Sequence, residues 1–403
     1  MQVTIKPKTV RGKIQAPPSK SMAQRCLICA ALADGKSRIE NIALSDDVSA
    51  VMRCISALGA KVDLSGGTAV VTGGLAPGNG AILDCGASAA TLRFLIPAAL
   101  LFNKEITFTG VPRLFSRPLG IYEEICAKYG ALFERGENFV KVKGRLPSGT
   151  YKIPGDVSSQ FASGLLFALP LLKGESEIEF TSPAESRSYV DMTVSVLSAF
   201  GVSAGWLGEK RIAVHGFSDF APANVAVEGD YSNAAFFAAL NCLGSEIEIC
   251  GLNPNSVQGD RAYEKYFPKL CSGRPTVDIT DCPDLAPALF VVAAAKNGAV
   301  FTGTRRLAYK ESSRAEAMAA ELEKFGARLE IDENSVTVFG GGLHPPKETL
   351  CGHGDHRIVM ALAVLCTAFG GKISGAESVC KSFPDFFDCM QKLGFETESG
   401  DDI

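Results

Sequence analysis

A lysine, a serine and an arginine lie together at the start of a predicted helix. A pair of prolines ending at Pro18 cannot lie inside a helix but can precede one, and Ser19 is a suitable N-cap. Ser21 and Arg25 are four residues apart and therefore share a helix face. Cations at a helix N-terminus oppose the helix dipole, which costs stability unless an anion is held there. The stretch that begins at Lys20 therefore predicts an anion-binding helix start.

The same design, a polar start followed by an apolar helix, occurs six times at intervals of 52 to 73 residues. The segments are 20–35, 91–103, 159–174, 232–244, 284–298 and 355–371. They are apolar on nearly every side, which is typical of buried helices. If these helices run parallel, their polar starts converge in each domain: Lys20, Ser21, Arg25, Arg93, Ser158, Ser159, Gln160, Ser232, Asn233, Asp284, Asp355, His356 and Arg357.

A second helix, which ends in glycine and leads into a short strand, recurs in phase with the first. Examples end at Gly59, Gly130, Gly201, Gly326 and Gly394, while the fourth copy near Cys271 is degraded. We therefore expect an α/β protein with helices inside and sheets outside, three repeats to a domain. The chain would pass from one domain to the other at two turn-rich stretches, Pro17-Pro18 and Gly229-Asp230, which we call the crossings. They predict a first domain of residues 19–228 and a second of residues 1–18 with 229–403. The converging polar starts favour an anion site in the cleft between them.

Length, charge and hydropathy exclude several classes of protein. A chain of 403 residues is long enough for two domains. Its net charge of -4 argues against a nucleic-acid partner. No apolar run reaches the roughly 18 residues that a membrane span needs. Residues 1–11 do not resemble a signal peptide, and 13 cysteines without one indicate reduced thiols. We therefore expect a monomeric, cytoplasmic enzyme that acts on small molecules and has no nucleic-acid or membrane partner.

Two spacings could suggest a metal site. Cys26 and Cys29 have the C-x-x-C spacing but lie in the apolar face of the first helix, and His353 and His356 have no further ligands beside them. We therefore predict no metal.

With these residues assembled, the chain resembles the 5-enolpyruvylshikimate-3-phosphate synthase family over essentially its whole length. Seven motifs carry the resemblance: Pro-Ser-Lys-Ser-x-x-x-Arg from Pro18, Arg-Pro-Leu-Gly from Arg117, Gly-Asp-Val-Ser-Ser-Gln-Phe from Gly155, Asp-Cys-Pro-Asp from Asp281, Lys-Glu-Ser-x-Arg from Lys310, Gly-Asp-His-Arg from Gly354 and Lys-Ser-Phe-Pro-Asp from Lys381.

The resemblance implies a two-domain inside-out α/β barrel, in which each domain has three βαβαββ repeats around buried parallel helices. It implies transfer of the enolpyruvyl group of phosphoenolpyruvate to the 5-hydroxyl of shikimate 3-phosphate. The reaction passes through a tetrahedral intermediate, releases phosphate and belongs to aromatic amino acid biosynthesis. No metal or organic cofactor is implied.

The matched positions imply roles for individual residues. The residues implied to bind shikimate 3-phosphate are Lys20, Ser21, Arg25, Ser158, Ser159, Gln160, Ser186, Tyr189, Asp284 and Lys310. Those implied to bind phosphoenolpyruvate are Lys20, Arg117, Gln160, Arg314, Arg357 and Lys381. Asp284 resembles the base for the 5-hydroxyl, and Glu311 and Lys20 resemble the groups that move the other protons. The resemblance also implies that His356 lies close to these catalytic residues in the site. The site has seven cations and only two carboxylates, so the cations would repel one another when the site is empty. We therefore expect the domains to close when the anionic substrates bind.

Two positions depart from the family pattern. Ala89 stands where the family usually has glycine in the loop before Arg93, at the space for phosphoenolpyruvate and its competitor glyphosate. A methyl group added to a packed pocket can reject a slightly longer ligand, so we expect glyphosate tolerance and weaker phosphoenolpyruvate binding. Arg306 stands where many members have asparagine.

Three alternatives differ in reaction or class. The sister transferase that acts on UDP-N-acetylglucosamine carries a reactive cysteine before its Arg-Pro, and residues 110–117 contain none. A non-catalytic phosphometabolite-binding relative would lose Asp284, Glu311 or Lys20, and all three are present. A Rossmann dehydrogenase needs a G-x-G-x-x-G after a strand, which is missing.

Overall fold

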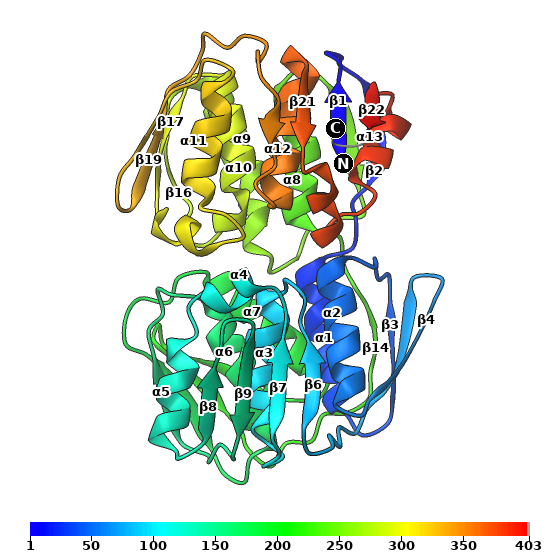
Figure 1. Ribbon diagram of the computed structural model, residues 1–403, viewed down its shortest axis with the longest axis vertical. Helices are drawn as coiled ribbons and strands as arrows, with labels where there is room; N and C mark the ends of the chain where they lie inside the picture. The colour runs from blue at the N-terminus through cyan, green and yellow to red at the C-terminus, as the bar shows by residue number, and fades with distance from the viewer. Residues whose placement is uncertain (401–403) are drawn as a thin grey trace. The chain divides into compact units, whose positions relative to one another are not determined.

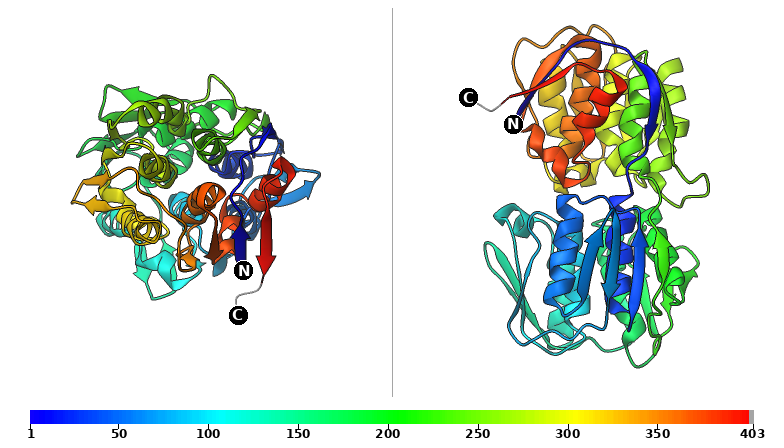
Figure 2. Two further views of the ribbon diagram at one scale, coloured as in Figure 1. Left: turned by 90° about the horizontal axis from the view of Figure 1, so that it is seen from above. Right: turned by 90° about the vertical axis from the view of Figure 1, so that its right-hand side faces the viewer.

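The computed structural model describes residues 1–400, which form two compact mixed α/β units (Figures 1 and 2). The continuous unit is Pro18–Glu228, and the split unit is Met1–Pro17 with the residues from Gly229 on. This division lies one residue from the expected one at the first crossing. None of the helices within residues 1–400 has the length and apolar character needed to cross a bilayer.

The continuous unit contains three four-stranded sheets. Their strand orders are β14(Asn224–Ala226)-β3(Lys36–Glu40)-β5(Thr68–Thr72)-β4(Lys61–Ser65), β6(Ala81–Asp84)-β7(Ile106–Thr109)-β9(Phe139–Lys143)-β8(Leu132–Arg135) and β10(Thr150–Ile153)-β11(Ser176–Phe180)-β13(Arg211–Val214)-β12(Ala204–Leu207). In each sheet the first two strands are parallel, and the last two form an antiparallel hairpin.

Three helices of this unit are buried: α1(Lys20–Leu32), which follows the first crossing and precedes β3, and α3(Ala89–Ala99) and α6(Ser159–Ala168), each of which connects two parallel strands. The outer helices are α2(Asp46–Ala57), α5(Gly120–Lys128) and α7(Arg187–Ala199), with a short α4(Pro112–Ser116). The predicted burial of the apolar helices is therefore confirmed. The predicted start of the second helix at Thr91 is wrong by two residues, because the Ser88 side chain caps the helix by accepting from the Thr91 N–H.

The split unit contains two four-stranded sheets and one two-stranded sheet. Their orders are β16(Thr276–Asp278)-β17(Ala299–Thr302)-β19(Ser335–Val338)-β18(Leu329–Ile331), β20(Leu350–Cys351)-β21(Gly371–Ser374)-β1(Gln2–Ile5)-β22(Thr397–Gly400) and β15(Glu246–Cys250)-β2(Arg11–Gln15). The helices are α8(Tyr231–Cys242), α9(Tyr263–Ser272), α10(Ala286–Ala295), α11(Arg314–Glu323), α12(His356–Phe369) and α13(Phe386–Leu393). The 3-10 turns are η2(Gly259–Ala262), η3(Pro283–Leu285), η4(Arg305–Tyr309) and η5(Ala376–Lys381), with η1(Leu169–Leu171) in the other unit.

The fourth repeat departs from the expected βαβαββ order. Its sheet pairs only β2 with β15, because α9 ends at Ser272 and β16 of the next repeat already starts at Thr276. The intervening residues are too few for the two strands of a hairpin. This shortening accounts for the interval of 52 residues in the sequence.

The strand before each crossing completes a sheet of the unit that the chain is about to leave. β2 pairs in parallel with β15 of the split unit, and β14 pairs in parallel with β3 of the continuous unit. The N-terminal segment predicted to lie in the second domain forms two strands of the split unit: β1 pairs with β21 and β22, and β2 pairs with β15. Each crossing therefore joins a finished sheet to the first buried helix of the other unit.

This topology explains why the polar helix starts gather within each unit. A helix between two parallel neighbouring strands runs back along them, so its N-terminus lies at the carboxyl ends of those strands. The same holds for α2, α5, α7, α11 and α13, since each of them joins two strands of one sheet that run in the same direction. Within one unit, side chains from several helix starts and from the preceding loops can therefore meet.

Candidate active site

The first buried helix begins as its sequence predicts. The Ser19 hydroxyl accepts from the Met22 N–H at 3.4 Å, which confirms Ser19 as the N-cap of α1. Lys20, the first residue of the helix, places its Nζ 2.9 Å from Oδ2 of Asp47 in the first turn of α2. Both side chains are largely buried. The ion pair joins the start of α1 to the start of α2. Asp47 was not among the predicted site residues.

Arg25 donates through all three of its guanidinium nitrogens, and two of them join α1 to α7. Nε donates to Thr193 Oγ1 at 2.8 Å, Nη1 to the Ser21 carbonyl at 2.8 Å and Nη2 to the Tyr189 carbonyl at 3.0 Å. The guanidinium also lies over the Phe94 ring, 5.0 Å from its centroid. Burial lowers the pKa of Arg25 to about 10, so it remains a cation at neutral pH.

Arg93 connects two of the predicted site segments. Its Nη1 donates to Gln160 Oε1 and its Nη2 to the Pro118 carbonyl, both at 2.8 Å. It thus holds Gln160 at the start of α6 beside the loop that carries Arg117. Gly164 permits this approach of α6 to α3, because a Cβ there would lie 2.3 Å from the Arg93 carbonyl oxygen.

The serines at the starts of α6 and α7 lie in different backbone conformations. Ser158 is extended, and its hydroxyl caps α6 by accepting from the Gln160 N–H at 3.3 Å, while Ser159 is buried. Ser186 is left-handed, with φ 54° and ψ 44°, and its side chain is 2% exposed. Such a conformation costs a non-glycine residue on the order of 1–3 kcal/mol and is concentrated at functional sites. The Tyr189 N–H donates to the Ser186 carbonyl at 3.1 Å, which holds this turn.

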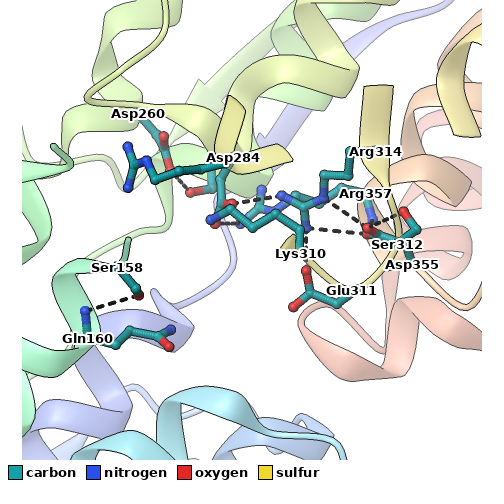
Figure 3. A network of polar contacts seen from close by, with 12 residues as sticks. Ser158, Gln160, Asp260, Asp284, Lys310, Glu311, Ser312, Arg314, Asp355 and Arg357 are labelled. Carbon is teal, nitrogen blue, oxygen red and sulfur yellow. Dashed lines mark hydrogen bonds and ion pairs between the residues drawn. The ribbon is translucent and has the colours of Figure 1, made fainter. Parts of the chain in front are cut away.

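In the split unit, three cations converge on Asp284 (Figure 3). Lys310 Nζ lies 3.1 Å and Arg314 Nη1 2.8 Å from Oδ1, and Arg357 Nη2 lies 3.0 Å from Oδ2. Burial by itself would raise the pKa of Asp284, but Arg357, Lys310 and Arg314 outweigh it and hold that pKa well below the ordinary value. Burial lowers the pKa of Lys310, although Asp284 opposes this effect. Asp284 lies in η3, before α10 rather than at the first residue of that helix as predicted.

Arg314 is at the centre of this network. Its side chain is 1% exposed and pairs with three carboxylates: Asp284, Glu311 at 2.8 Å, and Asp355 through Nε at 2.8 Å. Burial would lower the pKa of Arg314, but the carboxylates, Asp355 foremost, raise it well above its ordinary value. Arg314 is therefore held as a cation within its own unit.

Asp355 orients the start of α12. Its Oδ1 accepts from the Arg357 N–H at 3.0 Å, and its Oδ2 accepts from the Ser312 hydroxyl at 3.1 Å. His356 is 1% exposed, with Nδ1 3.7 Å from Asp355 Oδ1. Lys381, at the end of η5, is buried as well. The carboxylate of Asp355 thus links Arg314 on α11 to Arg357 on α12.

Contacts connect some of the predicted residues in two sets, one in each unit. In the first set Arg25 links Ser21 to Tyr189, whose N–H donates to the Ser186 carbonyl, whereas Lys20 pairs with Asp47. Asp284, Lys310, Glu311, Arg314 and Arg357 form the second set. Asp47, Arg93 and Asp355 hold Lys20, Gln160 and Arg314 in place. Asp47 was not predicted, and Arg93 and Asp355 were predicted only as polar helix starts without an assigned role. Their polar positions in helix starts were visible in the sequence, but their long-range partners were not.

The two metal-like spacings lead to different surroundings. Cys26 and Cys29 are buried in α1, and burial raises the pKa of Cys26 to about 12. His353 contacts Glu321, whereas His356 lies beside Asp355. Across residues 1–400 no three acidic, histidine or cysteine side chains are grouped so as to hold a metal ion.

Comparison with solved structures first defines the fold. An EPSP synthase from Acinetobacter baumannii superimposes with a TM-score of 0.80, covering 99% of this chain and 100% of the other at 24% identity. The enolpyruvyl transferase NikO from Streptomyces tendae gives a TM-score of 0.78 at 16% identity, with 98% of each chain covered.

Sequence comparison then identifies the family. The family model for EPSP synthase (3-phosphoshikimate 1-carboxyvinyltransferase) matches residues 4–390. A 3-phosphoshikimate 1-carboxyvinyltransferase of Clostridium kluyveri is 36% identical over 98% of both chains, and one of Clostridium acetobutylicum is 37% identical over 97% of both. The chain belongs to the EPSP synthase family.

Proposed function

We propose that this protein is a 3-phosphoshikimate 1-carboxyvinyltransferase. The 5-hydroxyl of shikimate 3-phosphate adds to C2 of phosphoenolpyruvate while C3 gains a proton. The tetrahedral intermediate then loses phosphate from C2 and a proton from C3, which restores the double bond. The observation that carries the proposal is the Asp284 cluster, a half-buried carboxylate among three cations in a chain of this family.

The charge of the site suits two anionic substrates. Each phosphate carries about -1.5 to -2 charges near neutral pH, and each substrate also has a carboxylate. The predicted set has seven cations and two carboxylates, and the pairs with Asp47 and Asp355 offset part of this excess. The remaining positive charge supports binding of both substrates. We assign Ser158, Ser159, Ser186 and Lys310 to the shikimate phosphate, and Lys20, Arg117, Arg314, Arg357 and Lys381 to phosphoenolpyruvate.

Asp284 is proposed to take the proton of the 5-hydroxyl. A carboxylate with a strongly lowered pKa is a weak base, so its cationic contacts must weaken before it can act. The phosphate and carboxylate groups of the substrates supply the counter-charge for Lys310 and Arg357. Substrate binding would therefore raise the pKa of Asp284 toward its ordinary value at the stage when a base is needed.

We assign the remaining proton transfers to Glu311 and Lys20 and propose His356 as a further catalytic residue. Glu311 is oriented by its 2.8 Å contact with Arg314, which supports an acid–base role at the methylene of phosphoenolpyruvate. Lys20 would then protonate the departing phosphate. In these steps every proton that is taken up or released is assigned to a side chain, so the proposed reaction needs no metal or organic cofactor.

We further propose the arrangement that family membership implies, with each unit a domain of buried parallel helices in an inside-out barrel. The active site would lie in the cleft between the domains, and the monomer would close on its substrates. Small-angle scattering from the free and doubly liganded protein checks closure. An unchanged radius of gyration would oppose it.

Ala89 supports a proposal about inhibition. It is the first residue of α3, follows the capping Ser88 and is 5% exposed. A methyl group at a tightly packed helix start leaves less room for a ligand than glycine would. We propose that the enzyme tolerates glyphosate and binds phosphoenolpyruvate more weakly than relatives with glycine.

The function is tested by phosphate release from phosphoenolpyruvate with three acceptors in parallel: shikimate 3-phosphate, UDP-N-acetylglucosamine and none. Release with the first alone is expected. Release with UDP-N-acetylglucosamine alone would identify the sister activity, and release with neither acceptor would favour a non-catalytic binding protein.

A further inference from the structure

Helix α11 holds the segment that leads into α12 at two points. Arg314 at its first residue pairs with Asp355, and Glu321, seven residues later, contacts Cys351 and His353. Residues seven apart lie on the same helix face, and both side chains are at most 2% exposed. The five residues from Cys351 to Asp355 are thus held at both ends from one helix.

Glu321 makes the second of these contacts with both carboxylate oxygens. Oε2 accepts from the Cys351 N–H at 2.8 Å, and Oε1 accepts from His353 Nε2 at 2.9 Å. Lys324 Nζ, 2.9 Å from Oε2, offsets the buried charge and also donates to the Thr349 carbonyl at 3.1 Å. A buried carboxylate with this many partners holds its neighbours in one geometry.

The backbone that Glu321 holds is strained. His353 has φ 51°, a left-handed conformation that favours glycine, and Gly354 follows with φ 63°. Gly352 approaches α12 so closely that a Cβ there would lie 2.6 Å from Val359 Cγ2. A histidine stays in such a conformation only when its surroundings hold it there. Here the ring contact with Glu321 does so, immediately before Asp355.

We propose that Glu321 is a positioning residue for the active site. Through Cys351 and His353 it sets the turn before Asp355, and thereby the position of Arg357 opposite Asp284. This inference rests on the proposed role of Arg357 in binding phosphoenolpyruvate. The hydrogen bonds and ion pairs of Glu321 are with Cys351, His353 and Lys324, so its effect on Arg357 is indirect.

The test is E321Q, which preserves shape but removes the charge that holds His353. Since an error of about 1 Å in a site can cost about 100-fold, we expect a smaller shift to raise KM for phosphoenolpyruvate roughly tenfold. KM for shikimate 3-phosphate should stay within about twofold. The matched control is E323Q, on the same helix but exposed, and it should change neither constant. Unchanged KM values in E321Q, with kcat reduced only in proportion to unfolded protein, would overturn the proposal.

A second variant guards against misfolding of E321Q. H353N removes the ring contact, while asparagine tolerates the left-handed conformation. If Glu321 acts through His353, the effects of E321Q and H353N on KM will not add in the double variant. Additive effects would refute that route. R357Q distinguishes the role of Arg357 from the positioning role of Glu321. If R357Q leaves KM for phosphoenolpyruvate unchanged, the assigned role of Arg357 fails. If KM for phosphoenolpyruvate rises in R357Q but not in E321Q, only the positioning role of Glu321 is refuted.

Discussion

Arg314 Nη1 lies 2.8 Å from Asp284 Oδ1, and the same guanidinium reaches Asp355 through Nε at 2.8 Å. One buried cation therefore connects the proposed base to the cap of the helix that carries Arg357. This relationship makes the stability of the split unit and the chemistry of its site depend on the same side chain.

Removing Arg314 should destabilise the protein strongly. R314M leaves Asp355 and Glu311 without their common cation, and loss of one partner from a buried pair costs about 3–5 kcal/mol. Urea unfolding of the parent and variant measures this. R314K, which retains the charge but cannot reach three carboxylates in the same way, should fall between them. A free energy of unfolding for R314M within about 1 kcal/mol of the parent would contradict the role of this cluster.

The contribution of Asp284 to stability should depend on pH. Its pKa is lower in the folded protein than the ordinary value of about 3.9 expected for the unfolded chain. Its carboxylate therefore adds stability above about pH 4, and that stability is lost as the pH falls through the folded pKa. D284N should be less stable than the parent by a constant amount between about pH 5 and pH 8. Below about pH 4 the difference should narrow, and a difference that widens there would reverse the assigned direction of the shift.

Replacing the proposed proton-transfer groups should reduce turnover far more than binding. General acid–base catalysis contributes about 10²–10⁴-fold, so D284N and E311Q should each lower kcat by about 10²-fold or more. Steady-state rates with saturating substrates test this, with calorimetric binding of shikimate 3-phosphate as the control. If kcat in both variants remains within about fivefold of the parent, neither residue transfers a proton in the slow step.

Ala89 should determine the response to glyphosate. A89G removes one methyl at the start of α3, where the added room is worth about 1–3 kcal/mol of discrimination. We expect the inhibition constant for glyphosate to fall about tenfold or more, together with KM for phosphoenolpyruvate. Micromolar inhibition of the parent protein would show that Ala89 is compensated elsewhere.

Local features of the site could be predicted from the sequence because they act over a few residues. Ser19 caps α1 through an N–H three residues away, and Arg25 reaches the Ser21 carbonyl one turn back. Asp47 escaped prediction, and Asp355 was predicted only as a polar helix start, because their partners lie 27 and 41 residues away in the chain. A carboxylate at a helix start can be a simple cap, and only the folded arrangement distinguishes the two roles.

The repeat pattern predicted buried helices and strands in phase, because a helix that is apolar on all sides must be covered. It did not predict that the fourth repeat lacks its hairpin. The degraded segment near Cys271 was the visible signal, but only the strand pairing identifies what is missing. The starts of the second and fifth apolar helices were displaced by the Ser88 cap and by the 3-10 turn at Asp284.

Mass spectrometry of the product formed in D2O tests the central claim most directly. Because C3 of phosphoenolpyruvate gains a proton from the protein before it loses one, solvent deuterium must enter the vinyl group. With shikimate 3-phosphate as acceptor we predict an enolpyruvyl ether that carries deuterium at this carbon. Absence of that product, or a product without deuterium, would contradict enolpyruvyl transfer by addition and elimination.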